Sequence, residues 1–340
     1  MISVGVIGCG YWGRNYVRLF DELHRSELIR CVDADRDKLA AIKQKYPLVD
    51  TSGNFEEILA DERIDAAVVC TPASTHYEVA RRCLEAGKAV LVEKPITTNS
   101  AEAAALVELA ESKGLTLMVG HTFLFNDAVI KMKELLQDEA FGELYYLHSR
   151  RNNLGPIRED VSAVWDLVPH DISIFRYLLG AEPETASAVG GCFLRDDRAD
   201  VAFINLTFPN HVVANIQASW VDSNKIREVV AIGSNMRIVF NDVDNLERIK
   251  IFKKGISAQR DINGFGEFQY LLRDGDIVSP KLDLREPLKT LCEHFLDCME
   301  SGKKPLSSGE DGRAIVTTIE AIEQSMKQNG APVRVGTSPA

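Results

Sequence analysis

Three ionisable side chains, Lys94, Asp166 and His170, have the types and spacing for acid–base chemistry. Asp166 and His170 are four residues apart, so they share one face if their segment is a helix. A histidine is able to accept the proton of an alcohol, and a lysine ammonium stabilises the oxyanion that remains. Pro169 must bend or interrupt the helix. A lone histidine on a helix is more often structural, so the residues alone leave both interpretations open.

The start of the sequence is typical of a dinucleotide-binding loop. Ile2–Ile7 is a short apolar run that predicts a buried strand, and Gly8, Gly10 and Gly13 follow it in the spacing G-x-G-x-x-G. In such a loop the first glycine allows a tight turn, the second lets a pyrophosphate approach the backbone, and the third lets the next helix pack closely. The N–H groups at that helix start favour phosphates. An α/β domain with an empty glycine turn is the alternative.

An acidic residue is expected about twenty positions further on, at the end of a second strand. Leu28–Val32 predicts that strand, and Asp33 ends it. A carboxylate there accepts both ribose hydroxyls of NAD and repels a 2′-phosphate. A surface aspartate in a turn is the alternative, and the nearby Arg36 leaves NADP open as well. The expected cofactor is NAD.

Strands and helices alternate as far as residue 122. The apolar runs 66–70, 89–92 and 115–119 predict strands with amphipathic helices between them. This rhythm predicts an N-terminal Rossmann domain, residues 1–122, with a doubly wound parallel sheet. Ligands bind beyond the carboxyl ends of such strands. The residues that directly follow a predicted strand, and are expected at one edge, are Gly8, Asp33, Thr71, Lys94 and His121.

From residue 123 the pattern changes to a series of strands. We expect strands at 144–151, 186–194, 200–208, 212–220, 226–232 and 236–240, and a polar loop at 150–160. Helices are expected at 128–137, 162–179, 288–300 and 313–328. The prediction is a C-terminal α+β domain, residues 123–340, with a large, mostly antiparallel open sheet. It leaves open that the C-terminal segment packs back on the first domain.

Composition excludes several classes of protein. With 39 basic and 50 acidic residues, the net charge of −11 argues against a nucleic-acid or membrane-surface binder. No apolar run approaches the roughly 18 residues of a membrane span, and the first strand leaves no room for a signal peptide. The seven cysteines have no C-x-x-C spacing and predict buried thiols in a reducing cytoplasm. No set of residues has metal-ligand spacing.

Three features together resemble the Gfo/Idh/MocA family of NAD(P)-dependent sugar and inositol oxidoreductases. They are the glycine motif, Glu93-Lys94-Pro95, and Asp166 followed four residues later by His170. The resemblance implies that Lys94 is catalytic, that His170 is the acid/base, and that Asp166 contacts the substrate. It also implies a homodimer or homotetramer formed through the C-terminal sheet. The further residues assigned to the cofactor are Tyr11, Trp12, Thr71, Pro72, His76 and Glu93.

Three more stretches are similar to nucleotide-sugar members of the family, in particular UDP-N-acetylglucosamine 3-dehydrogenases. They are 151–161, Ser219-Trp220 and 275–288. This implies oxidation of the C3 hydroxyl of a UDP-amino sugar to a ketone. An inositol or free-sugar dehydrogenase is one alternative, and a catalytically silent NAD-sensing regulator on the same fold is another. Substrate contacts are expected from His121, Arg151, Asn153, Arg158, Asp166 and His170.

Overall fold

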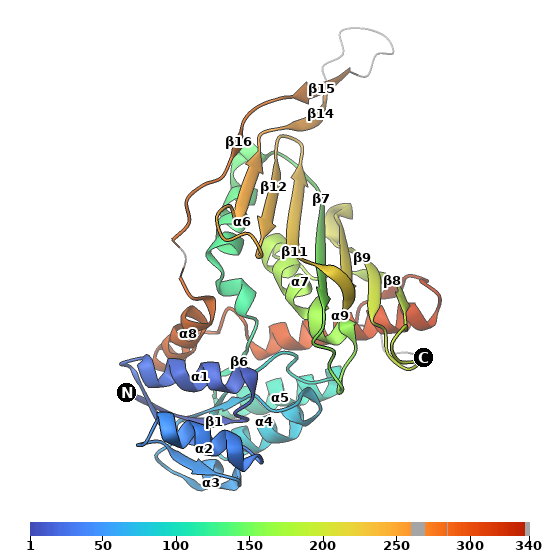
Figure 1. The fold of residues 1–340 in the computed structure, drawn as a ribbon. Coiled ribbons are helices and arrows are strands. Elements are labelled where there is room, and N and C mark those ends of the chain that lie inside the picture. The colour runs from blue at the N-terminus through green and yellow to red at the C-terminus, as the bar shows by residue number, and fades with distance from the viewer. Residues whose placement is uncertain (260–268, 284, 337–340) are drawn as a thin grey trace. The chain divides into compact units, whose positions relative to one another are not determined.

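The computed structural model describes residues 1–259, 269–283 and 285–336 (Figure 1). The chain divides into two units. Unit 1 comprises residues 1–125 and 285–320, and unit 2 comprises residues 126–284 and 321–340. The segment 285–320 thus belongs with the N-terminal residues rather than with the part of the chain that precedes it. The predicted boundary at residue 122 lies three residues from the end of the first segment of unit 1.

Unit 1 contains a parallel sheet in the order β3-β2-β1-β4-β5-β6 among the residues described, as the alternation predicts. Strands β4 and β5 are fully apolar and buried because helices α1 and α4 cover opposite faces (Figure 1). The strands are β1 (Ile2–Ile7), β2 (Ser26–Val32), β3 (Asp50–Ser52), β4 (Ala66–Val69), β5 (Ala89–Val92) and β6 (Leu117–Val119). The helices are α1 (Tyr11–Glu22), α2 (Arg36–Lys45), α3 (Glu56–Ala60), α4 (His76–Glu85), α5 (Ser100–Lys113) and α8 (Pro287–Ser301).

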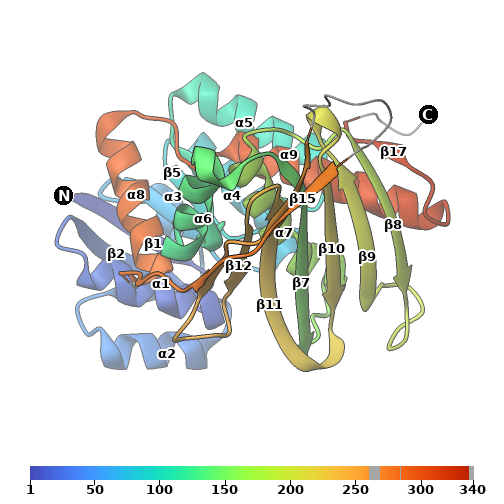
Figure 2. The ribbon, with the colours of Figure 1, turned by 90° about the horizontal axis from the view of Figure 1, so that it is seen from above.

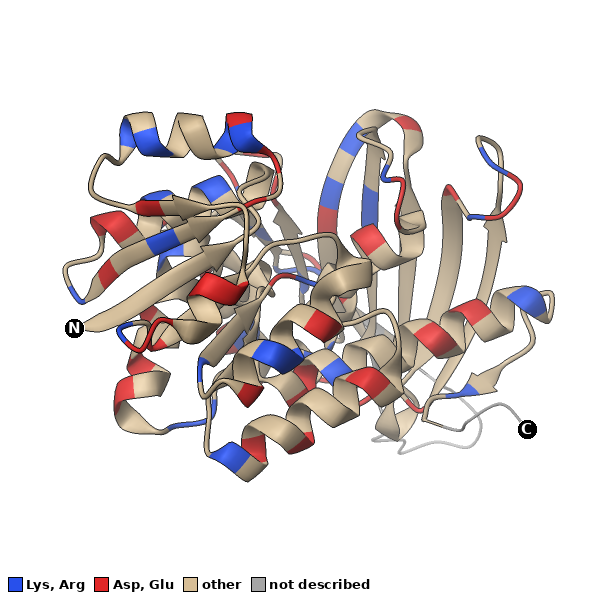
Figure 3. Ribbon diagram, turned by 90° about the horizontal axis from the view of Figure 1, so that it is seen from below, with Lys and Arg blue, Asp and Glu red and all other residues tan. Residues whose placement is uncertain are grey.

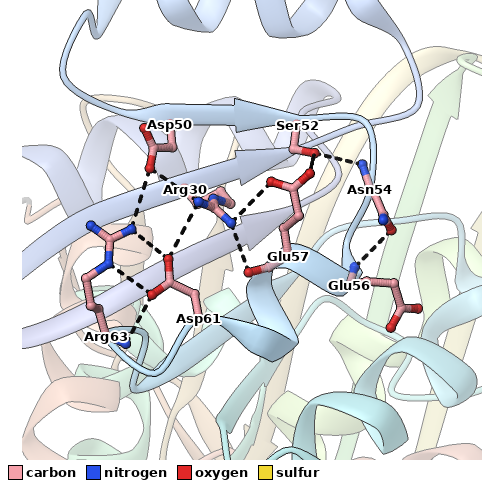
Figure 4. Close-up of polar contacts among 8 residues, drawn as sticks. All are labelled: Arg30, Asp50, Ser52, Asn54, Glu56, Glu57, Asp61 and Arg63. Atoms are coloured by element: carbon pink, nitrogen blue, oxygen red, sulfur yellow. Dashed lines mark hydrogen bonds and ion pairs between the residues drawn. The ribbon is translucent and has the colours of Figure 1, made fainter.

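A cluster of charged side chains lies at the β3 edge of this sheet (Figure 4). Arg30 of β2 lies 3.3 Å from Asp50, 3.2 Å from Glu57 and 3.6 Å from Asp61. Arg63 donates two hydrogen bonds to Asp61 and so lowers the pKa of that carboxyl to about 2. These ion pairs connect β2, β3 and the segment that includes α3. They lie at the edge of the sheet, where β3 has three residues and so forms few backbone hydrogen bonds.

Unit 2 is built on a large sheet in the order β16-β13-β12-β11-β7-β10-β9-β8-β17 among the described residues. Every neighbouring pair is antiparallel except β7 and β10, which run parallel. The mostly antiparallel sheet is therefore as predicted. The strands are β7 (Leu144–Leu154), β8 (Thr185–Gly191), β9 (Val201–Thr207), β10 (Val213–Ser219), β11 (Val221–Gly233), β12 (Arg237–Asn241), β13 (Ile249–Phe252), β16 (Ile277–Val278) and β17 (Val333–Arg334), and a separate hairpin is formed by β14 (Gly255–Gln259) and β15 (Gln269–Arg273).

Helix α7 (Ala163–Leu179) packs on β7, β9 and β10 from one side (Figure 2). Helix α6 (Asp127–Gln137) packs against α7 and β12. Alternation along the strands buries one face: Leu147, Ala214 and Ile216 are fully buried, whereas Tyr146 and Val213 are exposed. The opposite face of β7, β10, β9 and β8 is thus left open within unit 2.

The long helix α9 (Gly309–Lys327) begins in unit 1 and ends in unit 2. Acidic and basic residues are interspersed along the helices and strands (Figure 3). In the described part of the chain we find no helix with the length and hydrophobicity that a membrane span requires. All seven cysteines are free thiols, and only Cys192 is exposed.

Candidate active site

The glycine loop connects β1 to α1, and the fold itself requires a glycine at two of its three glycine positions. Gly8 has a φ of +93°, and a Cβ on it would lie 2.6 Å from the carbonyl oxygen of Cys70. A Cβ on Gly13 would lie 1.8 Å from the carbonyl oxygen of Gly8, so no other residue fits without moving backbone. A Cβ on Gly10 would meet nothing within 4 Å. The loop is thus tight on its inner side and open beside Gly10.

The start of α1 suits an anionic ligand. Gly10 is the N-cap and has no side chain to bond the first N–H groups, and the first turn has no acidic residue. These N–H groups and the positive end of the helix dipole therefore favour a phosphate. Tyr11 and Trp12 stand beside the loop, 74% and 40% exposed, with their rings edge to face at 5.3 Å. The open side of the loop fits the pyrophosphate of a dinucleotide.

Asp33 lies next to this loop, at the carboxyl end of β2. One carboxylate oxygen accepts the N–H of Cys9 at 2.7 Å, and the other accepts the N–H of Asp35 at 2.8 Å. Lys38, in the first turn of α2, lies 3.6 Å from the same carboxylate. The predicted neighbour Arg36 is exposed, so Lys38 is the cation that the structure places against Asp33. The loop and the acidic residue are therefore brought together, as a ribose subsite requires.

Glu93 and Lys94 follow β5 and are both buried, each 6% exposed. Glu93 accepts the hydroxyl of Tyr16 at 2.8 Å and the backbone N–H of Lys94 at 3.1 Å. Burial, and next the charge of Glu93, raise the pKa of Tyr16, so the phenol stays a donor. Tyr16 of α1 thus connects the helix that starts at the glycine loop with the backbone of Lys94. No sequence motif indicated Tyr16.

His76 connects the loop after β4 with the loop after β5. Its ring nitrogens lie 2.7 Å from the carbonyl oxygen of Pro95 and 2.9 Å from that of Thr71. The ring is 2% exposed, whereas Pro72 is exposed. His121 follows β6 and is also buried, at 1%. The structure therefore gives His76 a role in holding two loops together.

In unit 2, α7 carries Asp166 and His170 on one continuous helix. The Ser162 hydroxyl caps its start by accepting the N–H of Trp165, and Gly180 ends it in the left-handed conformation. The helix runs through Pro169 without interruption. Asp166 and His170 are both partly exposed, one helical turn apart.

Asp166 is held by two side chains from other segments. The indole Nε1 of Trp220 donates to its carboxylate at 3.3 Å, and the Arg158 guanidinium lies 3.6 Å from it. Arg158 also donates two hydrogen bonds to Asp160, at 3.0 and 2.7 Å. Burial acts to lower the pKa of Arg158, but the carboxylates of Asp160 and Asp166 outweigh it, so the pKa is raised and the charge retained. Of the predicted substrate contacts, Arg158 and Asp166 are thus brought together.

Two other residues that were predicted to contact the substrate form hydrogen bonds within unit 2. Arg151 forms a bidentate ion pair with Asp171 inside the unit. The Asn153 side-chain amide donates to the carbonyl oxygen of Gly155. The sequence did not single out Asp171, although it directly follows His170. Among the residues that the structure describes, no group of three or more His, Cys, Asp or Glu side chains is arranged to hold a metal ion.

Two family models match the chain. Residues 2–121 match the oxidoreductase family with an NAD-binding Rossmann fold, and residues 129–239 match the GFO/IDH/MocA C-terminal domain.

The relatives include the UDP-N-acetylglucosamine 3-dehydrogenase of Acidithiobacillus ferrooxidans, which is 30% identical over 96% of this chain and 97% of its own. Its solved structure superposes with a TM-score of 0.80, at 26% identity over 96% of this chain and 98% of that one. The myo-inositol 2-dehydrogenase of Thermotoga maritima is 26% identical over 96% of this chain and 97% of its own. Since these two models match residues 2–121 and 129–239, and the 30% identical relative spans 96% of the chain, this chain belongs to the Gfo/Idh/MocA family of oxidoreductases.

Proposed function

We propose that this enzyme oxidises the C3 hydroxyl of a UDP-amino sugar, such as UDP-N-acetylglucosamine, to a ketone with NAD. The observation that carries the substrate class is the 30% identity to a UDP-N-acetylglucosamine 3-dehydrogenase over nearly the whole of both chains. The buried Lys94 and the partly exposed pair Asp166 and His170 support the oxidation itself. A silent regulator has no need of these three side chains, and their presence disfavours that alternative.

In the proposed reaction, His170 accepts the proton of the sugar hydroxyl as a general base. The Lys94 ammonium stabilises the negative charge that develops on the same oxygen. Asp166, fixed by Trp220 and Arg158, orients His170 or accepts a hydrogen bond from another hydroxyl of the substrate. When bound, NAD supplies the acceptor for the hydride that leaves the carbon, so the alcohol loses one proton and one hydride. Arg158 and Asn153 are proposed as donors to substrate oxygens.

Production of NADH with a panel of UDP-sugars, free sugars and inositols tests the substrate class. We expect turnover with UDP-N-acetylglucosamine, provided that a reagent traps the ketone and so prevents an unfavourable equilibrium from hiding it. The His170→Ala variant is the negative control for NADH production. Activity on free myo-inositol with none on UDP-sugars would instead favour the second candidate, an inositol dehydrogenase, which the Thermotoga maritima relative supports.

Asp33 is proposed to select NAD, and Asp33→Ser is expected to lower the preference for NAD over NADP by roughly 10-fold to 10²-fold. The variant loses two acceptors for the ribose hydroxyls, where hydrogen bonds to a charged group contribute about 1.5–3 kcal/mol. It also leaves Lys38 with only Asp35 of its two carboxylate partners at this subsite. Isothermal titration calorimetry gives both dissociation constants. In Asp33→Ser/Lys38→Met the NADP affinity should fall again; an unchanged ratio in the single variant contradicts the role of Asp33.

We propose that the open face of the sheet in unit 2 binds a second copy of the chain. Tyr146, Val189, Phe203 and Val213 are 42–50% exposed, and the strand register places all four on the same face. Such a patch on a sheet is typical of a protein interface. Light scattering should therefore give a dimer or tetramer that Phe203→Asp weakens. A monomeric wild-type protein contradicts the proposal.

A further inference from the structure

Inside unit 2, Arg151 and Asp171 form a bidentate ion pair that is removed from solvent. The Nε of Arg151 donates to one carboxylate oxygen at 2.8 Å, and an Nη donates to the other at 3.0 Å. The two side chains are 4% and 0% exposed. Two parallel hydrogen bonds between planar groups fix both distance and orientation. The pair therefore joins its two elements, β7 and α7, in a single geometry.

The ion pair lies beside the turn of α7 that Pro169 weakens. Pro169 has no N–H, so the carbonyl of Trp165 lacks its usual helical donor there. This is the turn that carries Asp166 and His170, and Asp171 comes directly after it. Arg151 lies on β7, where pairing with β10 and β11 on both sides fixes its position. The pair thus ties the weakened turn to a central strand.

Stability alone does not account for such a pair. Removing two charges from water costs several kcal/mol per ion, and apolar residues of similar volume in place of a buried pair are often neutral or stabilising. Apolar side chains in the same place pack together but do not fix the orientation of the helix turn, whereas a bidentate ion pair does. Of the proposed catalytic residues, His170 is nearest to the pair in the chain, since it directly precedes Asp171.

We infer that Arg151 and Asp171 are positioning residues that fix the orientation of His170 and Asp166, and that Arg151 does not contact the substrate. The inference rests on the proposed function, in which His170 is the base. It revises the expectation that Arg151 binds substrate oxygens. Its guanidinium already uses two donors on Asp171 and is buried, whereas Arg158 is partly exposed.

The variant Arg151→Met/Asp171→Leu separates geometry from stability. We expect it to fold, because the replacements are apolar and similar in volume. We expect kcat to fall by on the order of 10-fold to 10²-fold, the range for a misplaced reacting group, with substrate KM changed less than about threefold. The dissociation constant of NAD, measured by calorimetry, should not change. The control is Arg176→Met/Glu182→Leu, which removes an ion pair near the other end of α7 and should leave kcat unchanged.

A readout independent of turnover is the imidazole NMR signal of His170, identified by its loss in His170→Ala. We expect its chemical shift to change in Arg151→Met/Asp171→Leu and to stay unchanged in the control variant. If the double variant does not fold, Asp171→Asn, which keeps one carbonyl acceptor, takes its place, with a smaller loss of kcat and the same change in signal.

Two outcomes overturn the inference. One is an unchanged kcat and an unchanged His170 signal in the folded variant. The other is a rise in KM whenever Arg151 is replaced, with kcat, KM and signal all unchanged in Asp171→Asn, which would make Arg151 a substrate contact. If His170→Ala itself keeps its turnover, the proposed function fails, and the NMR signal still decides whether the ion pair positions His170.

Discussion

Replacing His170 or Lys94 by alanine is expected to lower turnover by on the order of 10²-fold or more, the scale of positioned proton transfer and of charge stabilisation at an oxyanion. The dissociation constant of NAD should stay near the wild-type value in His170→Ala, because the glycine loop and Asp33 belong to the other unit. Lys94→Ala should bind NAD as well, since its backbone N–H to Glu93 does not depend on the side chain. Steady-state rates and calorimetry measure the two effects separately.

Matched controls exist for both variants. His24 and Lys45 are exposed, and alanine at either position should leave turnover unchanged. Near-normal turnover in both His170→Ala and Lys94→Ala would rule out the proposed assignment. A loss of turnover together with an equal loss of NAD binding in His170→Ala would instead indicate a general loss of structure.

Gly13→Ala is expected to weaken dinucleotide binding strongly and to destabilise the protein. The added Cβ would lie 1.8 Å from the carbonyl oxygen of Gly8, so the first turn of α1 and the loop must move apart. Overpacking of this kind costs about 1–3 kcal/mol, occasionally more. Because the displaced loop is the proposed pyrophosphate site, we expect the dissociation constant of NAD to rise by on the order of 10²-fold. Urea denaturation and calorimetry measure the two changes.

Gly10→Ala is the informative control. Its Cβ would meet no protein atom within 4 Å, and Gly10 has a φ of −71°, which any residue adopts. We expect the stability of this variant to be unchanged, whereas NAD binding weakens because the methyl group occupies the open side of the loop. Native affinity in Gly10→Ala would show that a phosphate does not approach this glycine.

The sequence predicts most strands and helices of unit 1 well because strong local signals bound them. Strands β1 and β5 have the predicted bounds, and α5 is one of the helices expected between the strands. The Asn99 side chain caps the start of α5 by accepting two backbone N–H groups, and Gly114 ends it with a φ of +63°. Buried parallel strands are continuous apolar runs, which turn residues delimit.

Prediction fails where pairing with a distant strand decides the conformation. Residues 152–154 are expected in a loop, but they extend β7 because Asn152 pairs with β10 and β11 and Leu154 pairs with β11. Similarly, β11 starts at Val221, which pairs with Leu154 of β7, five residues before the predicted start of that strand at 226. Strand β3 and the two-residue strands β16 and β17 are too short for a periodic pattern.

The residues of the candidate site fall into the same two groups, those that local patterns predict and those whose contacts depend on distant segments. The glycine loop, Asp33 and Lys94 follow from the rule that strand ends meet at one edge. The contact of Trp220 with Asp166 joins residues 54 positions apart, and Arg151 meets Asp171 across 20 positions. No local pattern predicts such pairs, since they depend on how α7 packs on the sheet.

The order of the chain has a consequence for its synthesis. Unit 1 requires α8, whose His294 ring packs at 5.3 Å from Phe125, and Ser307, whose hydroxyl bonds Val119. At about 5–20 residues per second, roughly 10–40 s separate the emergence of residue 125 from that of residue 320. Strand β17 completes the sheet of unit 2 later still. Unit 1 is therefore incomplete until residue 320 has been synthesised and unit 2 until β17 has been, so the apolar strands made first must wait for their partners.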